Sequence, residues 1–164
     1  TQMLDAEQRF SPLEIEDDDR PLAPWEVLAQ AGQVKAAIVE YVRAQGEVLF
    51  PQLITAMKPY METTGEVGLA VKTNPNTVLW CGMSAEFCAA LMELSIARRL
   101  YVHPAEPDEY RKQQAALKLP LLGEPTDEKL ARPKWLPSSL RVGPHPVHAA
   151  KLARLARIQL ANVT

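Results

Sequence analysis

The stretch TNPNTVLWCGMSAEFCAALMEL, residues 73–94, decides how the chain divides into elements. It begins with turn formers, continues as an apolar run around Trp80, and changes after Gly82 to the spacing of a helix. Asn and Pro favour turns, whereas Val and Leu favour strands, so VGLAVKT and TVLWCGM are expected to form a β-hairpin with its turn at residues 74–76. A strand that leads directly into a helix is therefore predicted.

The helix after this strand is expected to span residues 84–97. Ser84 suits its N-cap, and Glu86 suits the positive end of the helix dipole. Its buried side is marked by three apolar residues at helical spacing: Phe87, Leu91 and Leu94. An advance of 100° per residue places Glu86 and Glu93 on one exposed face, with Ala89 and Ala90 between them. This face carries carboxylates where a DNA-reading helix needs donors.

Three helices and a short strand are expected before this stretch. They are a helix from Pro24 to Gly32, a helix from Val34 to Gly46, a strand at residues 48–50, and a helix from Pro51 to Pro59. Proline favours the first turn of a helix and breaks its interior, and glycine commonly follows its last turn, so these residues bound the elements.

The region after residue 97 is predicted to contain two strands and a final helix. RRLYVHP leaves the helix as a strand, residues 104–108 turn the chain, and ALKLPLL, residues 116–122, alternates like an edge strand because its Pro120 cannot occupy a central one. Trp135 and Leu136 are expected to pin an irregular, proline-rich segment onto the domain.

These expectations divide the chain into four parts. Residues 1–23 form an extended acidic arm, residues 24–122 a domain, residues 123–146 a proline-rich segment packed on it, and residues 147–164 a basic C-terminal helix. The fold class is α+β.

The order of elements over residues 33–122 is helix, strand, helix, then helix, strand, turn, strand. This order resembles the winged helix-turn-helix superfamily, and the best local match is GMSAEFCAALMELSIARRLYVHPAEPDEY. The resemblance implies that residues 84–97 are the recognition helix and residues 101–118 the wing. It also implies DNA binding, or in some members protein docking. Residues 60–83 depart from the pattern, because the connection between its second and third helices is usually short.

Length and composition indicate a globular protein. The 164 residues are 47% apolar and 23% charged, and no run approaches the roughly 20 apolar residues of a membrane-spanning helix. The stretch TQMLDAEQRF lacks the basic and apolar parts of a secretory signal, and two cysteines are too few for a disulfide scaffold. A soluble, cytoplasmic protein with reduced, buried Cys81 and Cys88 is expected.

Charge is distributed unevenly along the chain. Residues 1–19 carry a net charge of −6, residues 20–97 carry −2, and residues 98–164 carry +6. This asymmetry indicates either a basic surface that binds nucleic acid or an acidic arm folded across a basic surface. Solvated charges without a partner are the alternative.

The stretch VHAAKLARLARIQLA, residues 147–161, is predicted to be a basic amphipathic helix. Its apolar side is formed by Leu152, Leu155, Ala156 and Leu160. Its basic side would neutralise phosphates or attract an acidic partner, although an ordinary solvated face is the alternative. A membrane-surface role is disfavoured, because the apolar side is narrow and lacks aromatic residues.

The residues expected to contact phosphate are basic positions in the second half of the chain: Arg98, Arg99, Arg111, Lys112, Lys151, Arg154 and Arg157. They would position a nucleic acid, since sequence readout has no convincing candidate. Asn74 and Asn76 could donate to bases, but turn chemistry explains them more simply.

No catalytic residue, metal ligand or cofactor is predicted. GEVGLAVKT lacks the spacing of a phosphate loop, and no GxGxxG occurs. The two cysteines and the histidines at positions 103, 145 and 148 fit no standard zinc pattern. The leading hypothesis is a non-enzymatic nucleic-acid-binding protein, with DNA the favoured target and transcription regulation one role. The alternative is a protein-interaction adaptor or complex subunit that uses the acidic arm with Glu86 and Glu93; a homodimer is left open.

Overall fold

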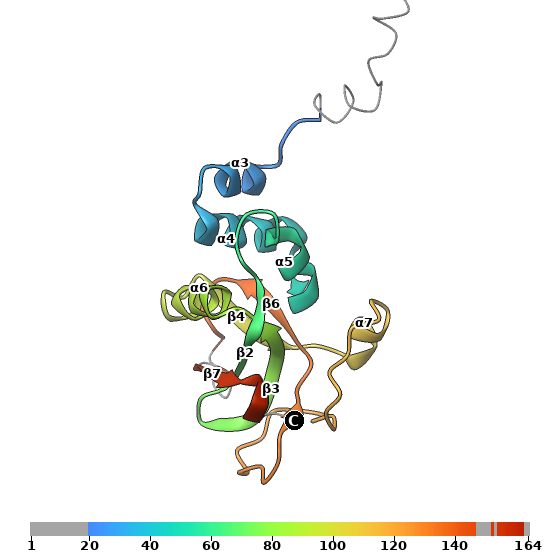
Figure 1. Ribbon diagram of the computed structural model, residues 1–164. Coiled ribbons are helices and arrows are strands. Elements are labelled where there is room, and N and C mark those ends of the chain that lie inside the picture. The colour runs from blue at the N-terminus through green and yellow to red at the C-terminus, as the bar shows by residue number, and fades with distance from the viewer. Residues whose placement is uncertain (1–19, 147–151, 153, 163–164) are drawn as a thin grey trace, which may run out of the picture.

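The computed structural model describes residues 20–146, 152 and 154–162 (Figure 1). The helices are α3 (Pro24–Gln30), α4 (Val34–Gln45), α5 (Phe50–Met57), α6 (Ala85–Ile96) and α7 (Pro107–Arg111), with a 3-10 turn η2 (Leu160–Asn162). The strands are β1 (Val48–Leu49), β2 (Thr64–Val71), β3 (Asn74–Met83), β4 (Leu100–Pro104), β5 (Lys134–Trp135), β6 (Ser138–Val142) and β7 (Leu155–Gln159). This mixture of helices and strands confirms the α+β class.

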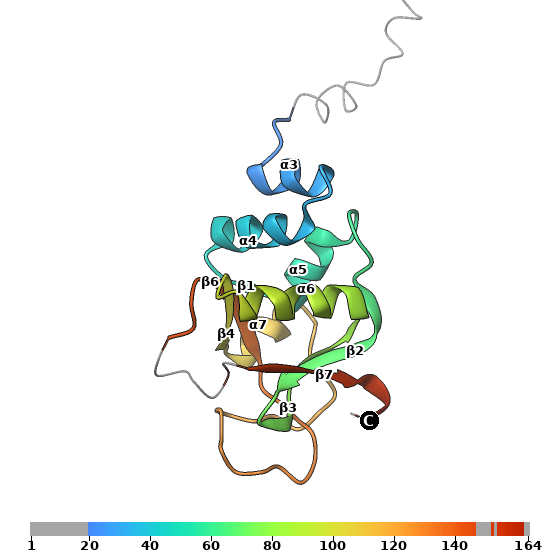
Figure 2. The ribbon, with the colours of Figure 1, turned by 90° about the vertical axis from the view of Figure 1, so that its left-hand side faces the viewer.

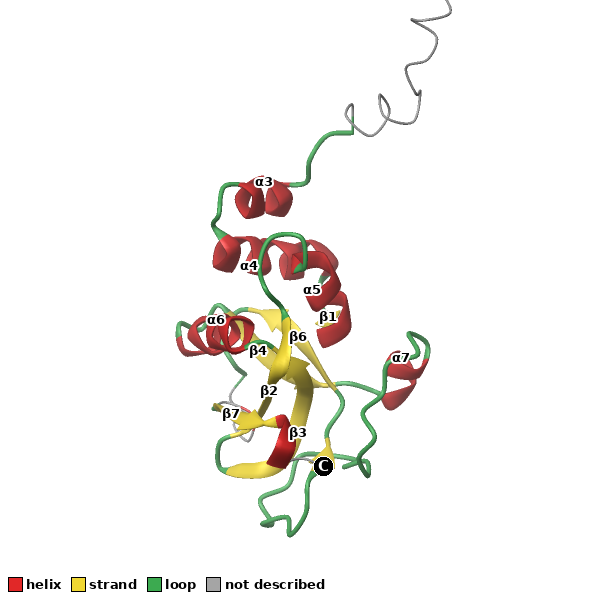
Figure 3. Ribbon diagram, in the orientation of Figure 1, coloured by secondary structure: helices red, strands yellow, loops and turns green. Residues whose placement is uncertain are grey.

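The described strands form two sheets (Figure 3). The three-stranded sheet has the order β1-β6-β4 and is antiparallel throughout. The four-stranded sheet has the order β5-β3-β2-β7, in which only the short β5 pairs in parallel. Helices α3, α4 and α5 lie at one end of the molecule, and α6 lies against the strands (Figures 1 and 2).

The helices of the N-terminal half lie where proline and glycine predict them. Pro24 and Pro51 occupy the first turns of α3 and α5. Gly46 ends α4 with φ 86°, a left-handed conformation that glycine adopts without the steric cost of a Cβ. The expected helices and the short strand before Pro51 are therefore confirmed.

The β2–β3 hairpin is confirmed, but its predicted turn is wrong. Val71 pairs with Asn74, so the loop consists of Lys72 and Thr73, and residues 74–76 belong to β3. The side chain of Asn74 instead donates from Nδ2 to the Glu128 carbonyl at 2.7 Å. Asn76 donates in the same way to the Leu130 carbonyl at 2.7 Å. Both amides hold a loop some 50 residues away, a role that local turn chemistry does not reveal.

Helix α6 starts as predicted. The Ser84 Oγ accepts a hydrogen bond from the Phe87 backbone N–H at 3.0 Å, which is an N-cap. The predicted residues Phe87, Leu91 and Leu94 are buried. Ala90, which we expected on the exposed face, is also buried, with 6% exposure. The helix contacts β2 and β7 as well as α4 and β4, so more of its surface is covered than one apolar stripe would cover.

The predicted wing at residues 101–118 is wrong beyond its first strand. β4 is present, but helix α7 follows it, and residues 116–122 form only an isolated bridge between Leu121 and Trp135. Tyr110 of α7 is fully buried, and its hydroxyl donates to the Ser138 carbonyl at 2.5 Å. Burial of this side chain anchors α7 in the region expected to be the tip of the wing, and the strand beside β4 is β6 instead of residues 116–122.

The proline-rich segment at residues 123–146 supplies β5 and β6, one strand to each sheet. Trp135 and Leu136 are 2% and 1% exposed, which confirms them as its anchors. The Trp135 ring lies 6.0 Å from that of Trp80 and 5.0 Å from that of Tyr110, and its Nε1 donates to the Leu79 carbonyl.

The helix predicted for residues 147–161 is wrong where the structure describes it. Residues 155–159 are the strand β7, which pairs with β2 from Val71↔Leu155 to Val67↔Gln159. Alternate residues of this strand form backbone hydrogen bonds to β2, and the pairing packs the segment onto the domain, so tertiary context overrides helical propensity here. Lys151 and the acidic arm at residues 1–19 lie outside the described residues.

Candidate nucleic-acid interface

A shallow hollow of about 270 Å³ lies where the end of α6 meets the start of β7. Its lining is Lys72, Met92, Ser95, Ile96, Arg154 and Leu155. The Lys72 backbone N–H donates to the Arg154 carbonyl at 2.9 Å, which ties the hairpin loop to the residue before β7. Two cations are thereby held together from segments that are 82 positions apart in the chain.

Arg98 and Arg99 follow directly after α6 and are exposed. Arg98 has φ 61°, so the chain leaves the helix through a left-handed residue. The Arg99 carbonyl accepts a hydrogen bond from the Gly143 N–H at 3.0 Å, which fixes this corner to the end of β6. Both guanidinium groups therefore come from anchored backbone.

Arg157 lies opposite Leu69 in the β2–β7 pairing and is also exposed. It lies close enough to Cys88 of α6 for its charge to lower the pKa of that thiol, although burial has the larger effect and raises the pKa to about 12. Arg157 is thus on the side of the sheet that α6 covers. We define the α6–β7 basic surface as Lys72, Arg98, Arg99, Arg154 and Arg157.

No salt bridge among the described residues involves any of the five residues of this surface. Free surface cations in such a cluster raise the local concentration of anions, because the fields of neighbouring like charges add.

Arg111 and Lys112 do not belong to this surface. They lie at the end of α7, and Figure 2 shows α7 behind α6 and β7. Arg111 donates to Asp108 at 2.6 Å and Lys112 to Glu109 at 3.4 Å, each three positions earlier on the same helix. The expectation that these two side chains join the C-terminal arginines is therefore wrong, because both are matched locally by acids on another side of the molecule.

Helix α6 leaves little surface for reading bases. Its exposed residues are Ala85, Glu86, Glu93 and Ile96. Glu93 makes an ion pair with Lys35 of α4. A helix in the major groove needs an uncovered face with donors, whereas strands cover one side of α6 and carboxylates mark the rest. This packing agrees with the carboxylate argument made from the sequence.

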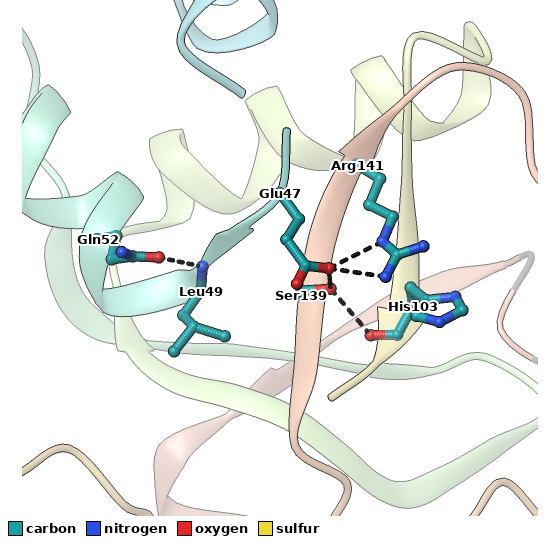
Figure 4. Close-up of polar contacts among 6 residues, drawn as sticks. All are labelled: Glu47, Leu49, Gln52, His103, Ser139 and Arg141. Carbon is teal, nitrogen blue, oxygen red and sulfur yellow. Dashed lines mark hydrogen bonds and ion pairs between the residues drawn. The ribbon is translucent and has the colours of Figure 1, made fainter. Parts of the chain in front are cut away.

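A second polar cluster lies at the junction of β1, β4 and β6 (Figure 4). Arg141 donates to the Glu47 carboxylate from Nε at 2.9 Å and approaches it from Nη2 at 2.8 Å. The Ser139 hydroxyl donates to the same oxygen at 3.2 Å. Burial lowers the pKa of Arg141, but contacts with Glu47 and Tyr101 together raise it above its ordinary value, so the guanidinium stays charged. This cluster braces the residue before β1 against β6.

Two adjoining hollows, of about 490 and 370 Å³, lie beside this brace. Gln52 and Gln113 line both. The larger hollow is bounded by Trp25 and Tyr41, whose rings meet edge to face at 5.0 Å, and the smaller by Glu47, Glu106, Glu109 and Arg141. The two hollows together form a groove that is aromatic at one end and mostly acidic at the other, whereas the α6–β7 basic surface is cationic.

The described residues hold no group of three or more His, Cys, Asp or Glu side chains arranged for a metal ion. Both cysteines are buried and unpaired, and burial raises the pKa of Cys81 to about 11. A thiol that stays protonated at neutral pH is a weak nucleophile. Across the described part of the chain, no helix is long and apolar enough to cross a membrane.

Comparison of the chain with protein-family models, with curated proteins and with solved structures gave no match.

Sequence reasoning missed Lys72, because the turn was placed after it. The hollow itself has one signal in the sequence. Ile96 follows the buried Leu94 at a position away from the apolar stripe, and the structure leaves it 79% exposed. An isolated apolar residue beside two arginines marks a surface with mixed chemistry.

Proposed function

We propose that the protein binds nucleic acid through the α6–β7 basic surface, by contacts to phosphates. The observation that carries this proposal is that five exposed cations come from three segments of the fold and none forms a salt bridge among the described residues. Phosphate contacts position a nucleic acid without reading its sequence. The proposal therefore assigns affinity to this surface and no base readout to α6.

The winged-helix resemblance supports the same class of function. The elements α4, β1, α5, α6 and β4 follow the predicted order, and β6 takes the place of the last strand. The β2–β3 hairpin is inserted between α5 and α6, and residues 105–137 are inserted between β4 and β6. The hairpin insertion contributes Lys72 and pairs with β7, so it helps to build the proposed surface.

The test is salt-dependent binding of fluorescent duplex and single-stranded probes, followed by mobility shift and anisotropy. If all five cations contact phosphates of B-DNA, the slope of log K against log salt is about −4.5, since each contact contributes about −0.9. Replacing Arg154 and Arg157 by Gln should reduce this slope to about −2.7. The matched control, Arg111→Gln with Lys112→Gln, should leave it unchanged. Absence of binding at low salt would refute the proposal.

A protein-interaction role is the second candidate, favoured by the groove between Trp25, Tyr41 and the Glu47 brace. Aromatic anchors beside charged rims are typical of protein-binding sites. If the wild-type chain binds no probe at low salt, this candidate replaces the first one. Substituting Tyr41 by Ala should then remove a captured partner, while Arg154→Gln should not.

A further inference from the structure

The lining of the hollow at the end of α6 is partly apolar and partly cationic. Met92, Ile96 and Leu155 supply apolar surface, and Lys72 and Arg154 supply positive charge. Ile96 is 79% exposed, and its side chain has no charge to attract a phosphate. Phosphate contacts therefore explain the cations of this lining and leave its apolar residues without a role.

A single-stranded nucleic acid carries both kinds of group that match this lining. Its phosphates are anionic, and each of its bases has a flat face that aromatic or apolar side chains cover. In a duplex these faces are stacked inside the double helix, so only unpaired bases present them beside phosphates. The hollow, of about 270 Å³, is concave, and a concave site is better suited to receive a base than to insert a side chain between two stacked bases.

The backbone on both sides of the hollow is fixed by hydrogen bonds. The Lys72 N–H donates to the Arg154 carbonyl at 2.9 Å, which joins the hairpin loop to the residue before β7. The Ala97 N–H donates to the Glu93 carbonyl at 2.9 Å and completes the last turn of α6, which carries Ile96. A site whose backbone is already ordered loses little entropy when a strand binds, so more of the contact energy appears as affinity.

We propose that the hollow seats one unpaired base of a single-stranded nucleic acid, with the phosphates on either side in contact with Lys72 and Arg154. The inference rests on the proposed function and narrows its ligand, since the hollow adds affinity for single strands that a fully paired duplex does not gain. Contacts to the face of a base do not distinguish the four bases. The hollow therefore selects unpaired strands and no particular sequence.

The test compares two fluorescent strands of about 12 nucleotides, one of thymidine and one that keeps the sugar–phosphate backbone but lacks every base. Both strands carry the same phosphate charge, so phosphate contacts alone give them equal affinities for the wild-type chain. Covering about 50 Å² of apolar surface corresponds to a factor of about 5–10 in affinity. The wild-type chain should therefore bind the thymidine strand about 5–10 times more tightly than the strand without bases.

Ile96→Gln tests whether the hollow is the source of this preference. The substitution removes apolar surface without changing the charge, and the fold tolerates it because the side chain is mostly exposed. It should remove most of the preference for the thymidine strand and leave both the salt slope and the affinity for a duplex unchanged. The matched control is Val27→Gln, at a 53% exposed position on α3 at the other end of the molecule (Figures 1 and 2), which should keep the full preference.

Each contrary result has a distinct meaning. Equal affinity of the wild type for the two strands, with salt-dependent binding to both, would overturn the seating of a base and leave the phosphate proposal intact. A preference that Ile96→Gln retains would also overturn it, because the base is then bound elsewhere. If Ile96→Gln weakens binding to the duplex as much as to the thymidine strand, the side chain inserts between stacked bases instead, and the proposal is again wrong. Absence of binding to every probe would refute the proposed function and this inference together.

Discussion

The Tyr110 hydroxyl is predicted to be one of the most important polar groups for stability. It lies in a fully buried side chain, donates to the Ser138 carbonyl at 2.5 Å, and accepts a weaker bond of 3.5 Å from the Phe50 N–H. Through these contacts α7 is joined to β6 and to the start of α5. Tyr110→Phe removes the hydroxyl but keeps a ring that stacks on Trp80 at 5.2 Å.

The expected loss of unfolding free energy is about 2 kcal/mol, because a buried carbonyl loses its partner and cannot regain water. For a chain of this size that loss corresponds to about 4–8 °C in Tm. The assay is urea and thermal unfolding followed by circular dichroism. Tyr60→Phe is the matched control, since its hydroxyl forms no hydrogen bond among the described residues; its change should stay within about 0.5 kcal/mol.

Unfolding measurements at alkaline pH distinguish the contribution of the Tyr110 hydroxyl to stability from that of its ring. Burial raises the pKa of Tyr110 well above its ordinary value. The phenol therefore ionises more readily in the unfolded chain, and its stabilisation is complete below pH 10 and declines above it. At pH 11 the difference between wild type and Tyr110→Phe should narrow by about 1.4 kcal/mol. A difference that stays constant between pH 8 and pH 11 would refute the buried-phenol argument.

Two further predictions test other polar contacts. Glu26 accepts hydrogen bonds from Arg20 and from the Ala23 N–H, which lower its pKa. Glu26→Gln should cost about 1 kcal/mol at pH 7, and in unfolding titrations the difference should shrink as the pH falls below 4.5 and disappear once the carboxyl of the folded chain is protonated. Asn74→Ala should cost about 1–3 kcal/mol, since the carbonyl of Glu128 and the N–H of Leu130 lose a partner. It should also speed hydrogen exchange at Leu130, and protection equal to wild type would contradict the anchoring role.

The elements predicted correctly from the sequence are those with local causes. Pro24 and Pro51 start helices, Gly46 ends one, and Ser84 caps one through its own side chain. Each cause lies within a turn of its effect, so no distant partner is needed to detect it. The same is true of the buried positions of α6, where the helical period alone selects Phe87 and Leu91.

The elements predicted wrongly are those whose partners lie far away. LARIQ at residues 155–159 suits a helix as well as a strand, and pairing with β2 decides the outcome. Residues 116–122 alternate like a strand but find only a single bridge at Leu121. In both cases the local pattern allows a strand, and a strand forms only where the backbone of another strand is available for pairing.

The cations considered for the candidate site include contacts with a local cause and contacts that depend on a distant partner. The pairing of Arg111 with Asp108 has a local cause, since an acid three positions earlier on a helix compensates a base, but it was missed because a turn was expected at residues 104–108 where α7 begins. The grouping of Lys72 with Arg154 was not, because it requires the register between β2 and β7. Charge counts thus located the basic half of the chain, and strand pairing placed Lys72, which lies outside that half, beside Arg154.

Because β6 lies in the centre of the three-stranded sheet, this sheet can form only late in synthesis. Val48 pairs with Leu140, about 90 residues later, so β1 and β4 have no neighbour until β6 leaves the ribosome. At about 5–20 residues per second that delay is on the order of 5–20 s, whereas a hairpin such as β2–β3 closes in about 1–10 μs. The strands of the hairpin are therefore able to pair long before the sheet beside them is complete, and Val48 waits for its partner in β6 throughout the interval.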